Sequence, residues 1–165
     1  PVSRLHLVMG KWIAVCVLGL GALFVTVGGF LAVVWWQAPI GWVVLAQLGV
    51  WVLLGLVPLA LSGSALHLLL AARSRTSQEA HGWHSIAMVV PMLAGMFLVF
   101  FPAWIGQWWF LAPVIGQQAL VVRALAGQPV LVLQAVVLAL ATIAAVVPAL
   151  IATRRATERD DVLAG

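Results

Sequence analysis

Four long stretches without a charged side chain constrain the fold of this 165-residue chain more than any other feature. They cover residues 12–36, 38–72, 85–122 and 124–153. A helix needs about 20 consecutive apolar residues to cross the hydrocarbon core of a bilayer, and each stretch is longer than that. A soluble domain of this size cannot bury so much apolar surface. The sequence therefore predicts an all-α integral membrane protein.

Composition supports the same conclusion. The chain is 65% hydrophobic and only 7% charged, whereas a soluble domain has about 25% charged residues. The net charge is +4, but the charges lie between apolar spans, so membrane lipid headgroups are the expected partners. Nucleic acid is not an expected partner, because no basic face with interleaved aromatic residues is present. Cys16 is the only cysteine, which excludes an internal disulfide.

The positions of lysine and arginine predict the topology. We expect membrane spans over residues 12–35, 42–72, 84–101 and 129–154, a cytoplasmic loop over 73–83 and a tail over 155–165. An even number of spans places both ends of the chain on one side. Seven of the eight basic residues then lie on that side: Arg4, Lys11, Arg73, Arg75, Arg154, Arg155 and Arg159. Since cytoplasmic loops carry the excess of basic residues, we expect a multi-pass plasma membrane protein with both termini cytoplasmic.

Residues 102–128 are apolar but interrupted by prolines, glutamines and Arg123. A fifth crossing here would place the C-terminal arginines outside, against the charge distribution. We therefore expect an outer helical segment before the last span. It either re-enters the membrane or lies in the outer interface as an amphipathic helix. Irregular backbone at membrane depth is tolerated only where other protein or a water-filled cavity covers it, so a re-entrant segment must pack against the bundle or a second subunit.

Tryptophan and proline add detail to this map. Indole rings prefer the membrane–water interface, and we expect an outer group at Trp35, Trp36, Trp42, Trp104, Trp108 and Trp109 and an inner pair at Trp12 and Trp83. Proline interrupts helical hydrogen bonding, so kinks are expected at Pro58 and Pro148. Such kinks are either static or bending points of a moving transporter.

No catalytic constellation is recognisable. Haem ligation needs histidines paired across spans, and only His67 lies well inside one. His81 lies in the loop and His84 at its junction with the next span, but no cysteine or carboxylate set completes a metal site there. The acids all lie in the loop or tail, where they cannot form the intramembrane proton relay of many carriers: Glu79, Glu158, Asp160 and Asp161. The chain also has no GxxxxGK[ST] phosphate loop. We expect no enzyme activity, cofactor or metal, and any energy for transport must come from another subunit.

Several short motifs follow one another along the chain. They are residues 1–5 (PVSRL), 9–12 (MGKW), 77–81 (SQEAH), 88–91 (MVVP), 112–115 (APVI), 125–127 (LAG) and 154–159 (RRATER). In this order they resemble the ABC type 2 exporter permeases, in the sodium-extrusion-permease-like branch. That branch has a "P-V-S-R … G-K" cytoplasmic stretch, a "K-E-A-Q" loop and a "P-V-x-N … L-L-x-G" region before its last helix. Gln78, Gln117 and Gln118 depart from the branch pattern, which leaves the transported species open.

The resemblance implies a transmembrane permease subunit that moves substrate out of the cytoplasm by ATP-driven conformational change. Permeases of this family pair as dimers and dock two cytosolic ABC ATPase subunits, which hydrolyse the ATP. The missing first helices of the family, and Pro1 in place of a methionine, imply that this chain is the C-terminal membrane portion of a longer permease.

The resemblance also implies which residues receive the ATPase motion. Residues 1–11 would be the principal coupling segment, with Arg4, Leu5 and Lys11 as its contacts. The loop over 73–83 would be a second contact through Arg73, Arg75 and Glu79. Alternatively, Arg4 and Lys11 only maintain the orientation and touch lipid headgroups. The alternative function is a small four-helix membrane scaffold or regulatory subunit without transport activity.

Overall fold

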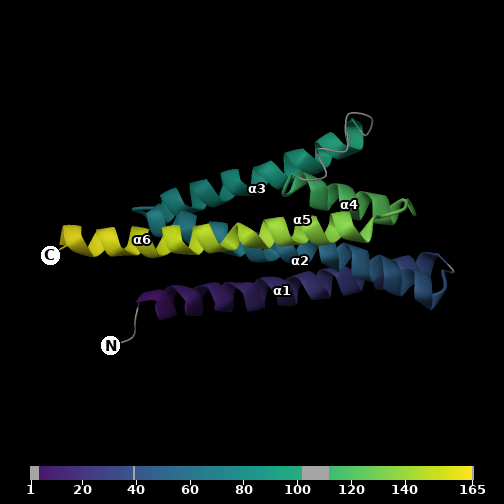
Figure 1. Cartoon of the computed structure of the whole chain (residues 1–165), viewed down its shortest axis with the longest axis horizontal. Coiled ribbons are helices and arrows are strands. Elements are labelled where there is room, and N and C mark those ends of the chain that lie inside the picture. Colours follow the sequence, from purple (N-terminus) through teal and green to yellow (C-terminus); the bar gives the residue numbers. More distant parts are fainter. Residues whose placement is uncertain (1–3, 39, 102–111, 165) are drawn as a thin grey trace.

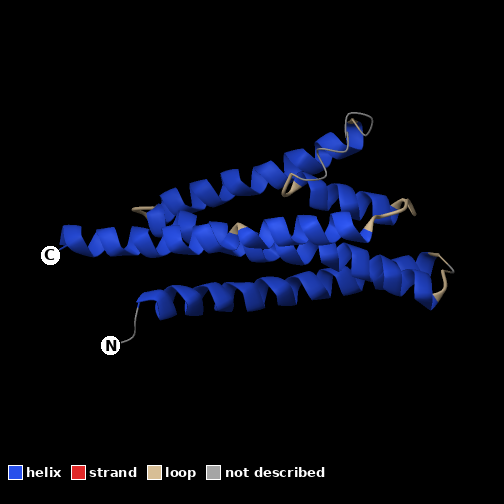
Figure 2. Cartoon of the chain, viewed as in Figure 1, coloured by secondary structure: helices blue, strands red, loops and turns tan. Residues whose placement is uncertain are grey.

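The computed structural model describes residues 4–38, 40–101 and 112–164, and the regular structure within them is helical throughout (Figure 2). The expected all-α fold is confirmed. The helices are α1 (Arg4–Gln37), α2 (Trp42–Arg73), α3 (Ser77–Phe100), α4 (Ile115–Leu125), α5 (Val132–Ala144) and α6 (Val146–Ala164).

Four helical segments are long and apolar enough to cross a membrane. They are Leu5–Gln37, Trp42–Arg73, Ser77–Phe100 and Val132–Thr157, of 33, 32, 24 and 26 residues. Each exceeds the length of about 20 residues that a bilayer requires. The fourth segment combines α5 with the first part of α6. A multi-pass membrane protein is therefore the architecture that the helices support.

The helices form one elongated bundle with both termini at the same end (Figure 1). The turn between α2 and α3 also lies at this end, which we call the terminal end. The turn between α1 and α2 and the connection from α4 to α5 lie at the opposite end (Figure 1). Trp35 and Trp42 stack there, with ring centroids 4.9 Å apart. An even number of crossings requires both termini to lie at one end of the bundle, and the chain has this arrangement.

Three helix ends lie beyond the spans expected from the charges. Helix α1 begins at Arg4 and passes residue 12 without a break, because the first eleven residues hold no helix-breaking proline after Pro1. Helix α3 begins at Ser77 rather than at His84, so much of the expected loop over 73–83 is helical. Helix α6 continues through most of the expected tail to Ala164. Hydropathy locates the membrane boundary, whereas backbone hydrogen bonding sets the helix ends.

The last span is interrupted near its middle. Helix α5 ends at Ala144 and α6 begins at Val146, and Figure 2 shows the short non-helical piece between them. Pro148 follows within one turn. Its missing N–H removes the helical hydrogen bond to Ala144, and its ring crowds the same carbonyl. The interruption lies where a kink at Pro148 was expected. Pro58 instead lies within the continuous helix α2.

Helix α2 is the centre of the bundle and contacts each of the other five helices. Small residues on α2 are buried at these contacts, including Gly49, Gly55, Ser64 and Ala65. Membrane helices associate through such small-residue faces because lipid offers no hydrophobic drive between them. In contrast, α1 and α3 expose most of their apolar side chains, as expected for surfaces that face lipid. Trp104, Trp108 and Trp109 lie outside the described residues.

Candidate functional site in the bundle interior

Helix α4 spans only part of the bundle. Its 11 residues rise about 16 Å, at 1.5 Å per residue, which is roughly half of a 30 Å hydrocarbon core. Figure 1 shows α4 lying along the bundle beside α3 and α5, not across its end. Both expected arrangements for residues 102–128, re-entrant or interfacial, stay predictions, and the described part lies along the bundle (Figure 1). Residues 102–111 lie outside the described residues.

The N-terminal end of α4 meets the middle of three other helices. Gln117 contacts Thr142 near the centre of the last span, and Gln118 contacts Pro91 near the centre of α3. The backbone of Gln117 also lies close to Gly55, near the centre of α2. We call Gln117, Gln118, Thr142 and the Pro91 carbonyl the polar layer. These groups place hydrogen-bonding chemistry inside a largely apolar bundle.

The residue before α4 has a strained backbone. Val114 has φ 73° and ψ −60°, which is rare and unfavourable for a β-branched residue. The Ile115 N–H donates to the Pro113 carbonyl at 3.0 Å, so Val114 is the centre of a γ-turn of the strained, positive-φ kind. Strain of this sort amounts to about 1–3 kcal/mol and persists only where the surroundings over-determine the conformation.

The side chain of Gln117 helps to hold Val114 in this strained conformation. Its side-chain Oε1 accepts a hydrogen bond from the Val114 N–H at 3.2 Å, and its Nε2 donates to the Thr142 Oγ1 at 2.7 Å. Gln117 is 0% exposed and Thr142 is 1% exposed. The Thr142 hydroxyl in turn donates a hydrogen bond to the Leu138 carbonyl at 2.9 Å. One buried amide therefore ties the strained turn to α5.

Gln118 connects α4 to the other side of the bundle. Its Nε2 donates to the Pro91 carbonyl at 2.8 Å. Its Oε1 is buried and has no hydrogen-bond partner among the described residues. A Cβ on Gly95 would lie 3.2 Å from this oxygen, so the glycine makes room for the amide. An unpaired buried acceptor is unfavourable by about 1–3 kcal/mol, which makes Gln118 the least satisfied member of the polar layer.

The close approach of α4 to α2 depends on Gly55. A Cβ added at this position would lie 2.8 Å from the Val121 Cγ2 and 3.2 Å from the Gln117 backbone oxygen. Gly63, on the same helix, has open space around the equivalent position. Gly55 is therefore required by contact with α4, not by the conformation of α2 itself.

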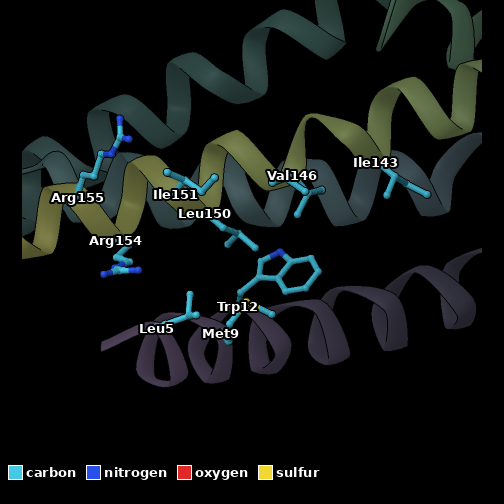
Figure 3. Close-up of a pocket in the computed structure, with 10 residues that line it drawn as sticks. Leu5, Met9, Trp12, Ile143, Val146, Leu150, Ile151, Arg154 and Arg155 are labelled. Carbon is cyan, nitrogen blue, oxygen red and sulfur yellow. The ribbon is translucent and has the colours of Figure 1, made fainter. Parts of the chain in front are cut away.

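The residues expected to couple to an ATPase all lie at the terminal end, in two groups. Arg4 is the first residue of α1, and Leu5 and Lys11 follow in its first turns, with Leu5 facing α6 (Figure 3). Arg73 lies in the last turn of α2, where a cation interacts favourably with the helix dipole. Arg75 and Glu79 are exposed at the α2–α3 turn. The structure brings them to one end but does not assemble them into one cluster.

Glu79 has a local structural role that sequence reasoning missed. The Glu79 N–H donates to the Thr76 Oγ1 at 3.1 Å, and the Glu79 Oε2 accepts from the Arg75 N–H at 2.9 Å. These two bonds satisfy backbone donors at the start of α3 in the manner of a capping box. The signal was present in the sequence, because Thr76 precedes Glu79 by three residues.

Two of the histidines lie against one another. His67 and His84 stack between α2 and α3 with ring centroids 4.1 Å apart. Among the residues that the structure describes, no three His, Cys, Asp or Glu side chains are grouped to hold a metal ion. Of the two histidines whose spacing the sequence analysis considered, His81 and His84, it is His84 that packs on His67.

Thr142 is the member of the polar layer that the sequence did not single out. Gln117 and Gln118 stood out in the sequence as interruptions of an apolar stretch and as departures from the permease pattern, not as hydrogen-bonding partners. A threonine within a span commonly bonds the carbonyl four residues earlier, as Thr142 does, so its presence carries little information. No protein-family model, curated protein or solved structure matches this chain.

Proposed function

We propose that this chain is the transmembrane permease part of an ATP-binding-cassette exporter of the type 2 kind, which moves substrate out of the cytoplasm. The observation that carries the proposal is the half-length helix α4, held in the bundle interior by a strained turn and two glutamines. Non-helical backbone and polar side chains at membrane depth are found mainly where a cavity or a moving element requires them.

The placement of α4 supports transport more than scaffolding. A scaffold needs only surfaces for its partners. A strained turn and an unpaired buried amide oxygen in its interior would be unfavourable and would serve no purpose there. In transporters, discontinuous helices place backbone and amide groups near the midplane, where substrate passes between packed elements. The Gln117–Thr142 hydrogen bond joins α4 to the last span. The strained turn at Val114 precedes Gln117 by three residues, and the interruption at Ala145 follows Thr142 by three residues. In our proposal the chain moves at these two positions.

In our proposal, a partner subunit supplies the energy for this movement. The chain contains no phosphate-binding loop of the GxxxxGK[ST] kind, and no carboxylate lies in its apolar stretches to relay protons. A cytosolic ATPase would contact the terminal end, which is then cytoplasmic in agreement with its excess of basic residues. Arg4, Leu5 and Lys11 are the proposed principal contact, and Arg73 and Arg75 the second. Pairing of two permeases would complete the transporter in the plasma membrane.

The proposal is tested with the intact permease, co-expressed with its ATPase and reconstituted in liposomes. Arg4→Glu/Lys11→Glu should leave assembly of the membrane protein intact but reduce ATPase stimulation by the permease. Gln37→Glu/Gln128→Glu, which adds two acids at the opposite end of the bundle, serves as the control and should retain stimulation. Failure of any ATPase to co-purify, with no ATP-dependent efflux of ions, drugs or peptides, would favour the scaffold instead.

A further inference from the structure

A groove opens between α1 and α6 near the terminal end (Figure 3). Its volume is about 790 Å³. Helix α1 contributes Leu5, Met9 and Trp12 to one wall, and α6, together with Ile143 at the end of α5, contributes the opposite wall and the floor. The lining is apolar except at one end, where Arg154 and Arg155 lie. The groove is thus amphiphilic along its length.

The floor and one wall of the groove are held by the surrounding core. Val146 and Leu150 are buried in a cluster with Val8 of α1 and Ala65 of α2. The Trp12 indole N–H donates to the Leu61 carbonyl of α2 at 3.4 Å, which fixes the orientation of the ring. The groove therefore exists without a bound molecule to shape it, and binding does not have to organise its lining.

The length of the groove corresponds to one leaflet of a bilayer. Its lining runs along the last span from Ile143 to Arg154. Eleven helical residues rise about 16 Å, close to half of a 30 Å hydrocarbon core. Ile143 adjoins the interruption near the middle of the span, whereas Arg154 lies toward the terminal end. An acyl chain that enters from the terminal side would end near the middle of the bundle.

Charge identifies the chemistry of the occupant. The lining residues include two arginines and no acid. In Figure 3 the Arg154 side chain points toward α1, above Leu5 and across the mouth of the groove, while Arg155 points the other way. Basic pockets between membrane helices on the cytoplasmic side favour anionic headgroups. A purely apolar helix from another protein would fit the walls but would offer no anionic group at the end where the two arginines lie.

We propose that this groove binds one anionic phospholipid of the leaflet at the terminal end. The phosphate lies at Arg154, and an acyl chain extends past Leu150 and Val147 toward Ile143. The exposed apolar surface of Val147 and Ile151, 60% and 48% accessible, is covered by this chain. The site does not depend on the proposed export function, since it rests on the groove and its charge alone.

The test measures lipid binding to the purified protein in detergent micelles by native mass spectrometry. Phosphatidylglycerol and phosphatidylcholine with identical acyl chains are titrated separately, and glycerol 3-phosphate serves as a headgroup without chains. We expect one phosphatidylglycerol to bind more tightly than phosphatidylcholine, and glycerol 3-phosphate neither to bind nor to compete. Equal binding of the two lipids would overturn the proposal, and so would competition by glycerol 3-phosphate.

Variants then locate the site. Arg154→Gln should weaken phosphatidylglycerol binding about fivefold, the effect of roughly one basic residue near an anionic surface, whereas Arg154→Lys should retain most of it. Arg75→Gln removes an exposed arginine at the same end but outside the groove, and should bind like the parent. Val147→Trp fills the groove from an exposed position and should weaken both lipids. Undiminished phosphatidylglycerol binding by Arg154→Gln would contradict the assignment.

Discussion

The Gln117 Nε2 donates a hydrogen bond to the Thr142 Oγ1 at 2.7 Å, which joins α4 to α5 in the middle of the bundle. Both side chains are almost completely buried. Because the same glutamine accepts from the Val114 N–H, this bond and the strained turn before α4 depend on one another. The interior of the bundle is therefore held by a specific polar contact as well as by apolar packing.

Removal of that contact should destabilise the protein measurably. Thr142→Val removes one partner, and we expect a coupling energy with Gln117 of about 0.6 kcal/mol, and at most about 1.7 kcal/mol, as in other membrane proteins. Gln117→Leu should have a larger effect, because it also removes the acceptor of the half-buried Val114 N–H, and a fully buried unpaired donor is unfavourable by about 1–3 kcal/mol.

The measurement is a double-mutant cycle of reversible unfolding in mixed micelles. Gln47→Leu, at an exposed position on α2, is the matched control and should change the free energy of unfolding little. Strictly additive effects of Gln117→Leu and Thr142→Val would show that the hydrogen bond contributes nothing.

Gly55→Ala should destabilise the contact of α4 with α2. The added Cβ would lie 2.8 Å from the Val121 Cγ2 and 3.2 Å from the Gln117 backbone oxygen, and only the first of these is a movable side-chain atom. Overpacking of this kind costs about 1–3 kcal/mol. Gly63→Ala, on the same helix with nothing near its Cβ, should be neutral or slightly stabilising. Thermal melts in one detergent compare the two, and equal melting temperatures would contradict the close approach.

The cap at the start of α3 gives a prediction that separates two roles of Glu79. Thr76→Ala and Glu79→Ala should each lower the local stability of the first turn of α3, by about 1 kcal/mol for the N-cap residue. Hydrogen exchange of the amides of residues 77–80 should accelerate in both variants, while Gln78→Ala, an exposed neighbour, should have little effect. If Glu79→Ala instead leaves exchange unchanged and abolishes ATPase stimulation, coupling is its principal role.

Cysteine labelling tests the topology, since the chain has only one native cysteine. Cys16 is buried, and a Cys16→Ser background removes it. In whole cells, a membrane-impermeant maleimide should label Gln128→Cys, which is exposed at the end opposite the termini. Arg75→Cys, at the terminal end, should react only after permeabilisation. Labelling in the reverse pattern would place the termini outside and remove the proposed ATPase surface from the cytosol.

Part of the candidate site could be predicted from the sequence, and part could not. The helical segment before the last span, and its two possible arrangements, followed from apolar residues interrupted by Pro113, Gln117 and Gln118. The partners of the two glutamines did not follow, because Thr142 and Pro91 are 25 and 27 residues away along the chain. Which pair meets depends on how α3 and α5 pack on α2, and apolar spans of similar composition do not specify that packing.

The sequence by itself determined the all-α membrane fold and the presence of four long apolar helices. This follows because residues 12–72 contain no Asp, Glu, Lys or Arg and the later apolar stretches only Arg123, a pattern that helices in lipid satisfy. The tertiary structure alone decided that α4 lies inside the bundle and that α1 and α6 leave an amphiphilic groove between them. Contact with lipid is almost equally favourable for any apolar helix surface. The positions of the helices are therefore set by close contacts at small residues such as Gly55 and by buried hydrogen bonds.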